Sequence, residues 1–387
     1  MEEIIMRYSR GERDFHGADL VGADFGNLEL KDVILDDANL ENSLFEKASF
    51  INASFVGAKL LNANFSDAYM LAGNFTNACL NNATLERARF DSSKFEKASL
   101  LDVNARVVDF SRTQLIDTVF MRSNLVGSLF KNAIFGRETS FKEAILTSAH
   151  FEECALEGID FRGVRASSSS FRKAHLGKTD FTGASLDLVD FFGAVLNDAD
   201  LSDANLQDAN LQTAHLYGAD LRGADLRETD LRHSDLLKTK FSRKGKYFCT
   251  RLEGAWIEPL TKRFIEDQAY LETYKAQHPA IYNLWLVTSD CGRSFLLWAF
   301  WGLVIACCFG WIFGAYPYHF SISGDCRIIT WFTYFYYSIV TFTTLGFGDV
   351  IPLDWIGEVL VTVEVVLGYV MLGGLMSILA NKIARRS

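Results

Sequence analysis

The sequence has few charged residues for its length and no cationic leader. Only 22% of its 387 residues are charged, while 49% are apolar, a balance that favours a membrane protein. The chain opens Met-Glu-Glu-Ile-Ile-Met-Arg, which lacks a cationic start followed by an apolar core, so nothing resembles a secretory signal. We therefore expect the N-terminal part of the chain to stay in the cytosol.

Several patterns that would carry other functions are also missing. The seven cysteines are scattered and odd in number, which argues against a disulfide framework and against a CxxC metal site. The sequence has no Arg-rich voltage-sensing helix, no calcium-loop pattern and no phosphate-cradling glycine motif. No His, Cys or carboxylate cluster has catalytic spacing. These absences predict a protein that is not an enzyme and holds no cofactor.

Negative charge is concentrated in the first two-thirds of the chain. From residue 242 onward there are 12 Lys and Arg against 11 Asp and Glu, so nearly all of the net charge of −10 belongs to residues 1–241. Residues 1–241 are therefore expected to form an acidic, soluble body.

A repeat of five residues fills that body. Every fifth residue from Phe15 to Phe135 is Leu, Phe or Met, except Ala105. The spacing is six across residues 136–140, and the repeat then continues from Phe141 to Phe241 with one further exception, Ala166. The extra residue fits either a loop or kink that divides the repeat into two blocks or a tolerated insertion.

A spacing of five excludes both a flat strand and a straight helix. Five is odd, so successive apolar centres would alternate between the faces of a strand, and on a helix they would step by about 140°. Only a chain that bends at every unit keeps all centres inside. A small residue two positions before most centres fits near each bend, and the Asp or Asn between them points outward.

This pattern resembles the pentapeptide-repeat family, shown most cleanly by Ala199-Asp200-Leu201 and by Ala219-Asp220-Leu221. The resemblance implies a right-handed, quadrilateral β-helix over residues 12–241, with four units per coil. About eleven coils at roughly 4.8 Å each would give a rod on the order of 50 to 55 Å long. Some family members are acidic rods that mimic duplex DNA; the alternative favoured here is a scaffold or assembly domain, without a nucleic-acid partner.

Two later segments are long and apolar enough to cross a membrane. Residues 295–316 carry no charge, and residues 356–380 are interrupted only by Glu358 and Glu364. Between them, residues 328–342 are uncharged and mostly aromatic but too short to span, which indicates a re-entrant helix. The cationic end at Lys382, Arg385 and Arg386 suits a cytosolic C-terminus, so both termini are expected in the cytosol.

The re-entrant segment leads into Thr344-Leu345-Gly346-Phe347-Gly348-Asp349. This run resembles the Thr-Val-Gly-Tyr-Gly-Asp filter of potassium channels, and the order of segments resembles the two-helix members of that family. The resemblance implies a homotetramer in which backbone carbonyls of residues 344–348 bind K⁺ as the permeant ion, and no other metal.

Elementary backbone chemistry agrees with this interpretation. Gly346 and Gly348 permit the φ values needed to aim successive carbonyls at one axis, and the Thr344 hydroxyl adds oxygens at the inner end. Asp349, with Asp354 nearby, would form a negative outer mouth. Leu345 and Phe347 replace the usual valine and tyrosine, which leaves a less selective cation channel as an alternative.

Three further residues of the second span are singled out. Gly368 lies where the family's inner helix has its hinge, and Gly373 marks a second soft point; close helix packing through small residues is the alternative. Glu364 is costly inside a bilayer, so we expect it behind the re-entrant helix, bonded to a hydroxyl such as Thr341.

The predicted architecture is therefore multidomain. A β-helix is followed by a linker over residues 242–294, mostly helical from 262 to 286 with a break at Pro279, and by an all-α, two-helix pore domain over residues 295–387. The apolar segment 281–287 either lies in the membrane interface and passes force to the first span or is an anchor.

The function predicted from these features is a potassium-selective channel subunit of the cell membrane. Its partners would be three further copies, membrane lipids and a cytosolic regulator of the repeat. A membrane-tethered scaffold or DNA mimic is the alternative from another class.

Overall fold

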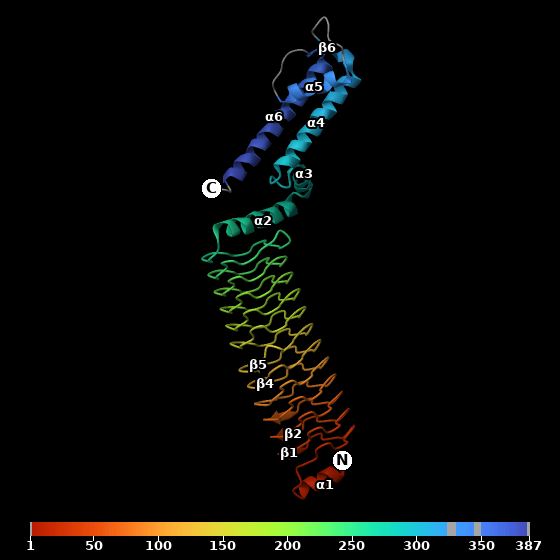
Figure 1. Cartoon of the computed structure of the whole chain (residues 1–387), viewed down its shortest axis with the longest axis vertical. Helices are drawn as coiled ribbons and strands as arrows, with labels where there is room; N and C mark the ends of the chain where they lie inside the picture. The colour runs from red at the N-terminus through yellow and green to blue at the C-terminus, as the bar shows by residue number, and fades with distance from the viewer. Residues whose placement is uncertain (1, 323–329, 344–349, 385–387) are drawn as a thin grey trace. The chain divides into compact units, whose positions relative to one another are not determined.

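The computed structural model describes residues 2–322, 330–343 and 350–384 (Figure 1). The chain divides into two compact units, Met1–Thr273 and Tyr274–Ser387. The elements are α1 (Glu2–Ser9), β1 (Glu29–Lys31), β2 (Ser49–Ile51), β3 (Tyr69–Leu71), β4 (Gln114–Leu115), β5 (Ile134–Phe135), α2 (Pro259–Gln277), α3 (Pro279–Ser289), α4 (Phe295–Ala315), the 3₁₀ turn η1 (Pro317–His319), β6 (Phe320–Ile322), α5 (Trp331–Phe342), β7 (Val350–Pro352) and α6 (Trp355–Ala384).

The N-terminal unit is a stack of coils, each made of four five-residue units (Figure 1). Parallel bridges join residues twenty apart, as in Asp160 to Asp180 and Asp180 to Asp200. Most pairings are single bridges, and β1, β2 and β3 form a short parallel sheet in the same register. The β-helix implied by the resemblance to pentapeptide-repeat proteins is therefore confirmed.

Each unit ends in a tight turn. The backbone N–H of the small residue three positions after a centre donates to the carbonyl of that centre, as from Ala18 to Phe15 at 3.1 Å. The second residue after a centre takes a positive φ, for example 57° at Asn27 and 65° at Gly17. Such turns favour Gly, Asn and Asp at that position, which explains why these residues recur in the repeat.

The apolar centres fill the interior of the coils. Phenylalanine rings stack along the axis, with centroids 4.9 Å apart for Phe151 and Phe171. Both exceptions in the repeat, Ala105 and Ala166, are also fully buried, so they hold centre positions with smaller side chains.

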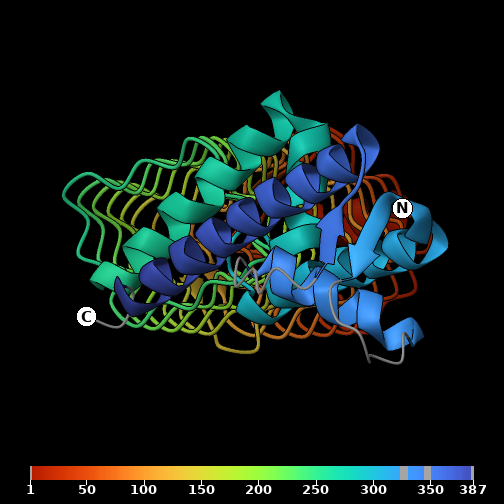
Figure 2. The same cartoon turned by 90° about the horizontal axis from the view of Figure 1, so that it is seen from above.

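The extra residue near position 136 is an insertion within one continuous β-helix. The bridges from Val119, Asn124 and Leu129 each reach a residue 21 positions on, and from Ser140 the spacing returns to twenty. The rings of Phe120 and Phe141 stack across it with centroids 5.0 Å apart and planes 2° apart. The turn that takes up the residue stands out from its neighbours in Figure 2 (gold). The structure therefore favours the tolerated insertion over a division into two blocks.

The β-helix also continues beyond Phe241, where the sequence prediction ended it. A second 21-residue step, from Asp225 to Lys246, restores the ladder, which runs on to Trp256. Tyr247 is fully buried at the next centre. The inserted residue interrupts the five-residue period, which is why the sequence pattern stopped too early.

Helices close both ends of this core. Ile4 of α1 is buried in the core cluster, and the Tyr8 hydroxyl accepts the backbone N–H of Lys31 at 2.8 Å. At the other end, Ile265 of α2 is buried in the same cluster, and the carboxylate of Glu272 accepts the N–H groups of Tyr247 and Phe248 at 2.8 and 3.0 Å. These contacts cover apolar and polar groups that the last coil would otherwise expose.

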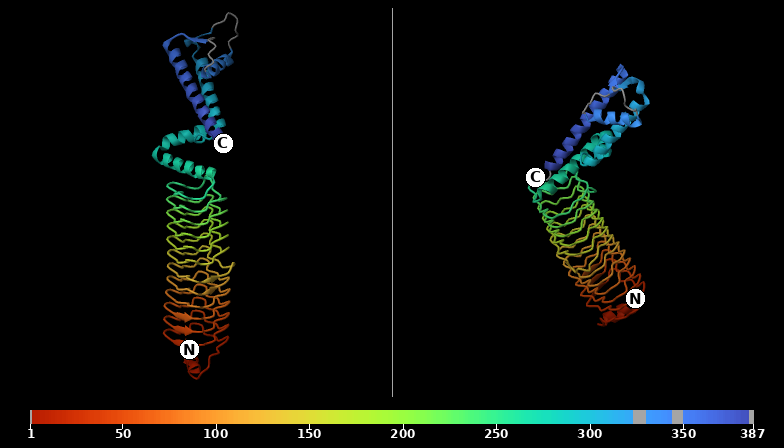
Figure 3. Two further views of the ribbon diagram at one scale, coloured as in Figure 1. Left: turned by 90° about the vertical axis from the view of Figure 1, so that its left-hand side faces the viewer. Right: turned by 45° about the horizontal axis from the view of Figure 1, so that its top comes forward.

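The C-terminal unit contains α3, α4, α5 and α6. The helices α4 and α6 run side by side, and α5 packs against both (Figure 3). The expected spans 295–316 and 356–380 correspond to Phe295–Ala315 and Trp355–Ala384, and α5 begins at Trp331, with residues 328 and 329 of its predicted range outside the described residues. Pro279 is the first residue of α3, directly after the break that it was predicted to cause.

The stability of the β-helix is expected to fall in acid. Arg232, which bonds both carboxylate oxygens of Asp230 at 2.7 to 3.2 Å, holds the pKa of this aspartate below its usual range. A carboxyl with a lower pKa in the folded state stabilises it above the unfolded pKa of about 3.9, and this contribution is lost as the pH falls. Asp230→Asn should remove part of the decrease in the free energy of unfolding between about pH 5 and pH 2.

The measurement is chemical unfolding of the full chain in detergent at several pH values, monitored by circular dichroism. Asp208→Asn, at an exposed turn position, is the matched control and should leave the pH dependence unchanged. Equal slopes for Asp230→Asn and the unaltered protein would contradict the prediction.

Candidate functional site

Two helices of the C-terminal unit meet the requirements for crossing a membrane. Phe295–Ala315 in α4 and Trp355–Ala380 in α6 each have a mean hydropathy of 2.1 over their most apolar window. At 1.5 Å per residue, both exceed the hydrocarbon thickness of about 30 Å. The two helices are therefore long and apolar enough to span a bilayer, as the sequence predicted.

The third helix, α5, is held between them by aromatic side chains and by one close approach. Tyr334 is buried in a cluster with Phe313 of α4 and Phe320 of β6. A Cβ atom added to Gly310 of α4 would lie 2.9 Å from the Cα of Phe335, so only glycine allows this separation. Thr330 and Thr333 form a capping box that starts α5 at Trp331.

The predicted potassium-binding residues and the predicted outer-mouth residue, Asp349, lie outside the described residues. These are Thr344, Leu345, Gly346, Phe347, Gly348 and Asp349. The structure describes what precedes and follows them: α5 ends at Phe342, and β7 begins at Val350. The sequence therefore assigned the filter to the segment that lies between α5 and β7.

The strand β7, which follows residues 344–349, is bonded to β6, which precedes α5. The strands β6 and β7 pair antiparallel, with Ser321 opposite Ile351. Beyond β7, the Asp354 carboxylate accepts the N–H of Gly357 at 2.9 Å and also bonds His319. The Gly357 N–H and then His319 hold the pKa of Asp354 below its usual range. Asp354 therefore caps the start of α6, and the sequence did not reveal its bond to His319, which is 35 residues away.

Glu364 of α6 is fully buried and faces α5, as expected, but its partner is not Thr341. Its Oε1 bonds the hydroxyl of Ser338, which also donates to the carbonyl of Ala306 in α4 at 2.6 Å. One polar cluster thus joins all three helices. Ser338 was missed by sequence reasoning because it stands among other hydroxyl residues of α5 without a distinguishing pattern.

The glycines of α6 differ in their surroundings. A Cβ atom added to Gly368 would lie 2.1 Å from the carbonyl oxygen of Phe342, and one added to Gly374 would lie 2.3 Å from the Trp298 ring. The same atom on Gly373 would meet nothing within 4 Å. Close packing therefore accounts for Gly368 and Gly374, whereas Gly373 is open, and the hinge role of Gly368 and Gly373 stays a prediction.

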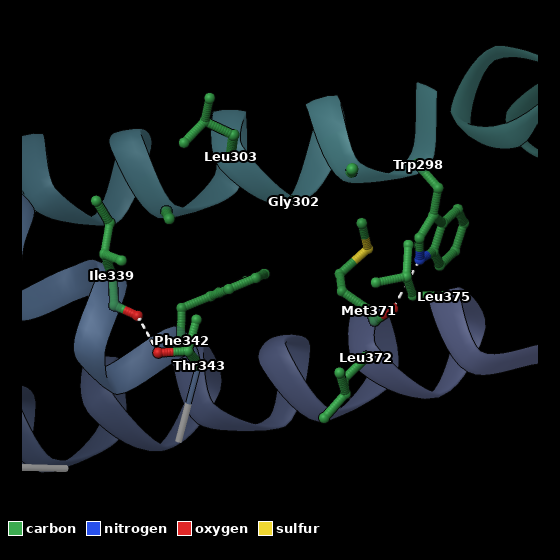
Figure 4. A pocket seen from close by; sticks show the side chains of 11 residues that line it. Trp298, Gly302, Leu303, Ile339, Phe342, Thr343, Met371, Leu372 and Leu375 are labelled. Atoms are coloured by element: carbon green, nitrogen blue, oxygen red, sulfur yellow. Dashed lines mark hydrogen bonds between the residues drawn. The ribbon is translucent and has the colours of Figure 1, made fainter. Parts of the chain in front are cut away.

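An apolar cavity of about 280 Å³ lies between α4, the C-terminal end of α5 and α6 (Figure 4). At one end, the indole N–H of Trp298 donates to the backbone carbonyl of Met371 at 2.7 Å. At the other, the Thr343 hydroxyl donates to the carbonyl of Ile339 at 2.7 Å. Both polar groups are thus satisfied within the protein, so the cavity presents an essentially apolar lining.

Comparison with protein families agrees with the division of the chain into an N-terminal repeat unit and a C-terminal helical unit. A family model described as an ion channel matches residues 297–385. A model described as a pentapeptide repeat region matches residues 144–220, and one described as pentapeptide repeats, in eight copies, matches residues 14–46, 34–70, 74–104 and 209–243.

Solved structures similar to this chain include three pentapeptide repeat proteins. HetL, involved in heterocyst differentiation regulation in the cyanobacterium Nostoc sp. strain PCC 7120, is 23% identical, with 66% of this chain and 95% of HetL covered and a TM-score of 0.27. QnrB1, a plasmid-mediated fluoroquinolone resistance protein, is 21% identical, with coverage of 49% and 96% and a TM-score of 0.30. A protein from the Arabidopsis thaliana thylakoid lumen is 26% identical, with coverage of 27% and 71% and a TM-score of 0.26. A comparison with curated proteins finds no match.

The chain therefore contains pentapeptide repeats, matched within its N-terminal unit, and a two-helix ion-channel domain at its C-terminal end. With its two apolar helices, the channel domain places the protein in a membrane. Both matched families are non-enzymatic kinds of protein.

The close approach at Gly368 leads to a stability prediction. Gly368→Ala should destabilise the C-terminal unit by about 1–3 kcal/mol, because the new methyl group meets a backbone oxygen that cannot rotate away. Gly373→Ala, five residues along the same helix, should be neutral or slightly stabilising, since alanine favours a helix by up to about 1 kcal/mol over glycine.

Thermal unfolding of the purified protein in detergent compares the two variants. A melting temperature for Gly368→Ala equal to that of Gly373→Ala would show that the packing around Phe342 does not constrain this position.

Proposed function

We propose that the protein is a subunit of a potassium-selective channel in which four copies surround one pore. The observation that carries the proposal is the run Thr344–Asp349, which resembles a potassium filter and follows α5 directly, between the two spanning helices. Four such runs supply rings of backbone carbonyls that replace the hydration shell of K⁺. A single copy cannot close this cage, which is why the proposal includes a homotetramer.

The proposed site residues have separate roles. The carbonyls of residues 344 to 348 bind the permeant K⁺, Gly346 and Gly348 allow the backbone to aim them inward, and Asp349 attracts cations at the outer mouth. The mechanism needs no cofactor and no metal other than K⁺, because conduction is passive.

Two alternatives predict different outcomes. Leu345 and Phe347 depart from the usual filter sequence, and a weaker filter would pass Na⁺ as well as K⁺. A membrane-tethered scaffold or DNA mimic would pass neither ion. Flux measurements therefore separate all three functions.

Purified protein reconstituted in liposomes is expected to pass K⁺ at a rate at least about tenfold above Na⁺, since the carbonyl cage favours the larger ion. Gly346→Asp is the control and should reduce K⁺ flux to background, because the side chain and altered backbone disrupt the cage. Similar K⁺ and Na⁺ fluxes would support the less selective channel. Background flux for the unaltered protein would exclude a channel function.

We further propose that the N-terminal unit lies in the cytosol of a cell whose cytoplasmic membrane holds the pore, with both termini on the cytosolic side. Lys382, Arg385 and Arg386 support this orientation by the preference of cationic ends for the cytosol. The β-helix then acts in assembly or gating, either among the four copies or with a cytosolic regulator.

Removal of the N-terminal unit tests this role. A chain that starts at Tyr274, the first residue of the C-terminal unit, should still conduct but with an altered open probability, since the rods no longer bias the pore. Single-channel recording in planar bilayers measures the difference. An open probability and regulation identical to those of the full chain would contradict a gating role.

A further inference from the structure

Glu364 is the one buried acid among the described residues of α4, α5 and α6. The segment Phe295–Ala315 contains no Asp, Glu, Lys or Arg, and neither does Trp331–Phe342. Glu364 is nevertheless 0% exposed, between these two helices. An ionised carboxylate in such a place costs several kcal/mol or more unless a cation or several hydrogen bonds compensate it.

The hydrogen bonds around Glu364 do not provide that compensation. Its Oε1 bonds the Ser338 hydroxyl, and its Oε2 is buried without a hydrogen-bond partner among the described residues. A carboxylate normally accepts several hydrogen bonds. One serine hydroxyl is therefore too little for a charged form.

The number of protons in the cluster gives a second, independent argument. Three oxygens lie in a row: the Ala306 carbonyl, the Ser338 hydroxyl at 2.6 Å from it, and Oε1 of Glu364. The two contacts between these oxygens require two hydrogens. Ser338 supplies one, and a carbonyl supplies none. The second hydrogen must come from Glu364.

We propose that Glu364 is a protonated carboxylic acid that donates to Ser338, which in turn donates to Ala306. This chain of two hydrogen bonds fastens the pore helix α5 to α6 on one side and to α4 on the other. Glu364 is then a positioning residue for ion conduction, because α5 leads within two residues into the proposed filter. The functional part of this inference rests on the proposed channel activity, whereas the protonation itself does not.

The neighbouring titratable groups do not offer a counter-charge. On α5, the titratable side chains are Tyr334, Tyr336 and Tyr337. On α4, the titratable side chains are Cys307 and Cys308, and on α6 they include Glu358 and Tyr369. None of these is a cation at neutral pH, and the one lysine of α6, Lys382, lies 18 residues beyond Glu364, about five helical turns away. The neutral acid is therefore the form that the described surroundings favour.

Ionisation would break the connection. A carboxylate cannot donate, so the serine hydroxyl would turn toward Glu364 and leave Ala306. The buried charge would then draw water or force α5 away from α6. Conduction is therefore expected to decrease in alkaline solution.

Infrared spectroscopy of the full-length protein at neutral pH tests the protonation directly. The unaltered protein should show a carboxylic-acid C=O band that shifts in heavy water and is absent from Glu364→Gln. Glu358→Gln, at an exposed position six residues earlier in α6, is the matched control and should keep the band. An identical spectrum for Glu364→Gln and the unaltered protein would overturn the proposal, and this result does not depend on whether the protein conducts.

Potassium flux against pH tests the positioning role. Between about pH 7 and pH 10, flux through the unaltered protein should fall about tenfold, the size expected for the loss of one buried hydrogen bond. Glu364→Gln should conduct at neutral pH, because its amide still donates to Ser338, and should lose the alkaline decrease. A Glu364→Gln profile that falls as steeply as that of the unaltered protein would exclude the role.

Two serine variants separate hydrogen bonding from packing. Ser338→Ala removes both contacts and should lower flux at neutral pH about tenfold. Ser338→Thr keeps the hydroxyl and should restore most of it. Equal losses in both variants would indicate that the serine acts through its size alone and would contradict the hydrogen-bond chain.

Discussion

The N–H of Phe181 donates to the carbonyl of Asp200, one coil further on, and this link is repeated throughout the N-terminal unit. Each coil satisfies its neighbour's backbone while its apolar centres fill the interior. The rest of the unit follows from this constraint. Inserted residues must be absorbed in turns without breaking the ladder, as near positions 136 and 242, and both ends must be covered, which α1 and α2 do.

The C-terminal unit meets the same requirement in a different way. Its spanning helices satisfy their backbone groups internally, as a hydrocarbon environment demands. Contact between the helices then depends on close approach and on a few polar groups. Gly310 and Gly368 bring α4 and α6 against α5, and the Ser338 cluster with Glu364 adds a polar connection at the same helix. Helix α5 is thereby held from both sides, just before the segment proposed to bind ions.

Much of this architecture could be predicted from the sequence, because it depends on short motifs and on periodic patterns of apolar residues. The five-residue period required a chain that bends at every unit, and hydropathy identified the helices α4, α5 and α6 to within a few residues. The run Thr344–Asp349 resembles a potassium filter because its motif is contiguous in the sequence. Where a periodic signal was interrupted, as by the residue inserted before Tyr247, the sequence-based boundary stopped too early.

The sequence by itself thus determined the two-part organisation, the apolar centres and the run Thr344–Asp349, since each depends on neighbours in the chain. The tertiary structure alone decided which hydroxyl meets Glu364, which glycine is packed against a carbonyl, and which histidine bonds Asp354. The physical reason is distance along the chain. These contacts join residues 26 to 35 positions apart, and the rotation of each helix about its own axis, set by packing, selects the side chains that meet.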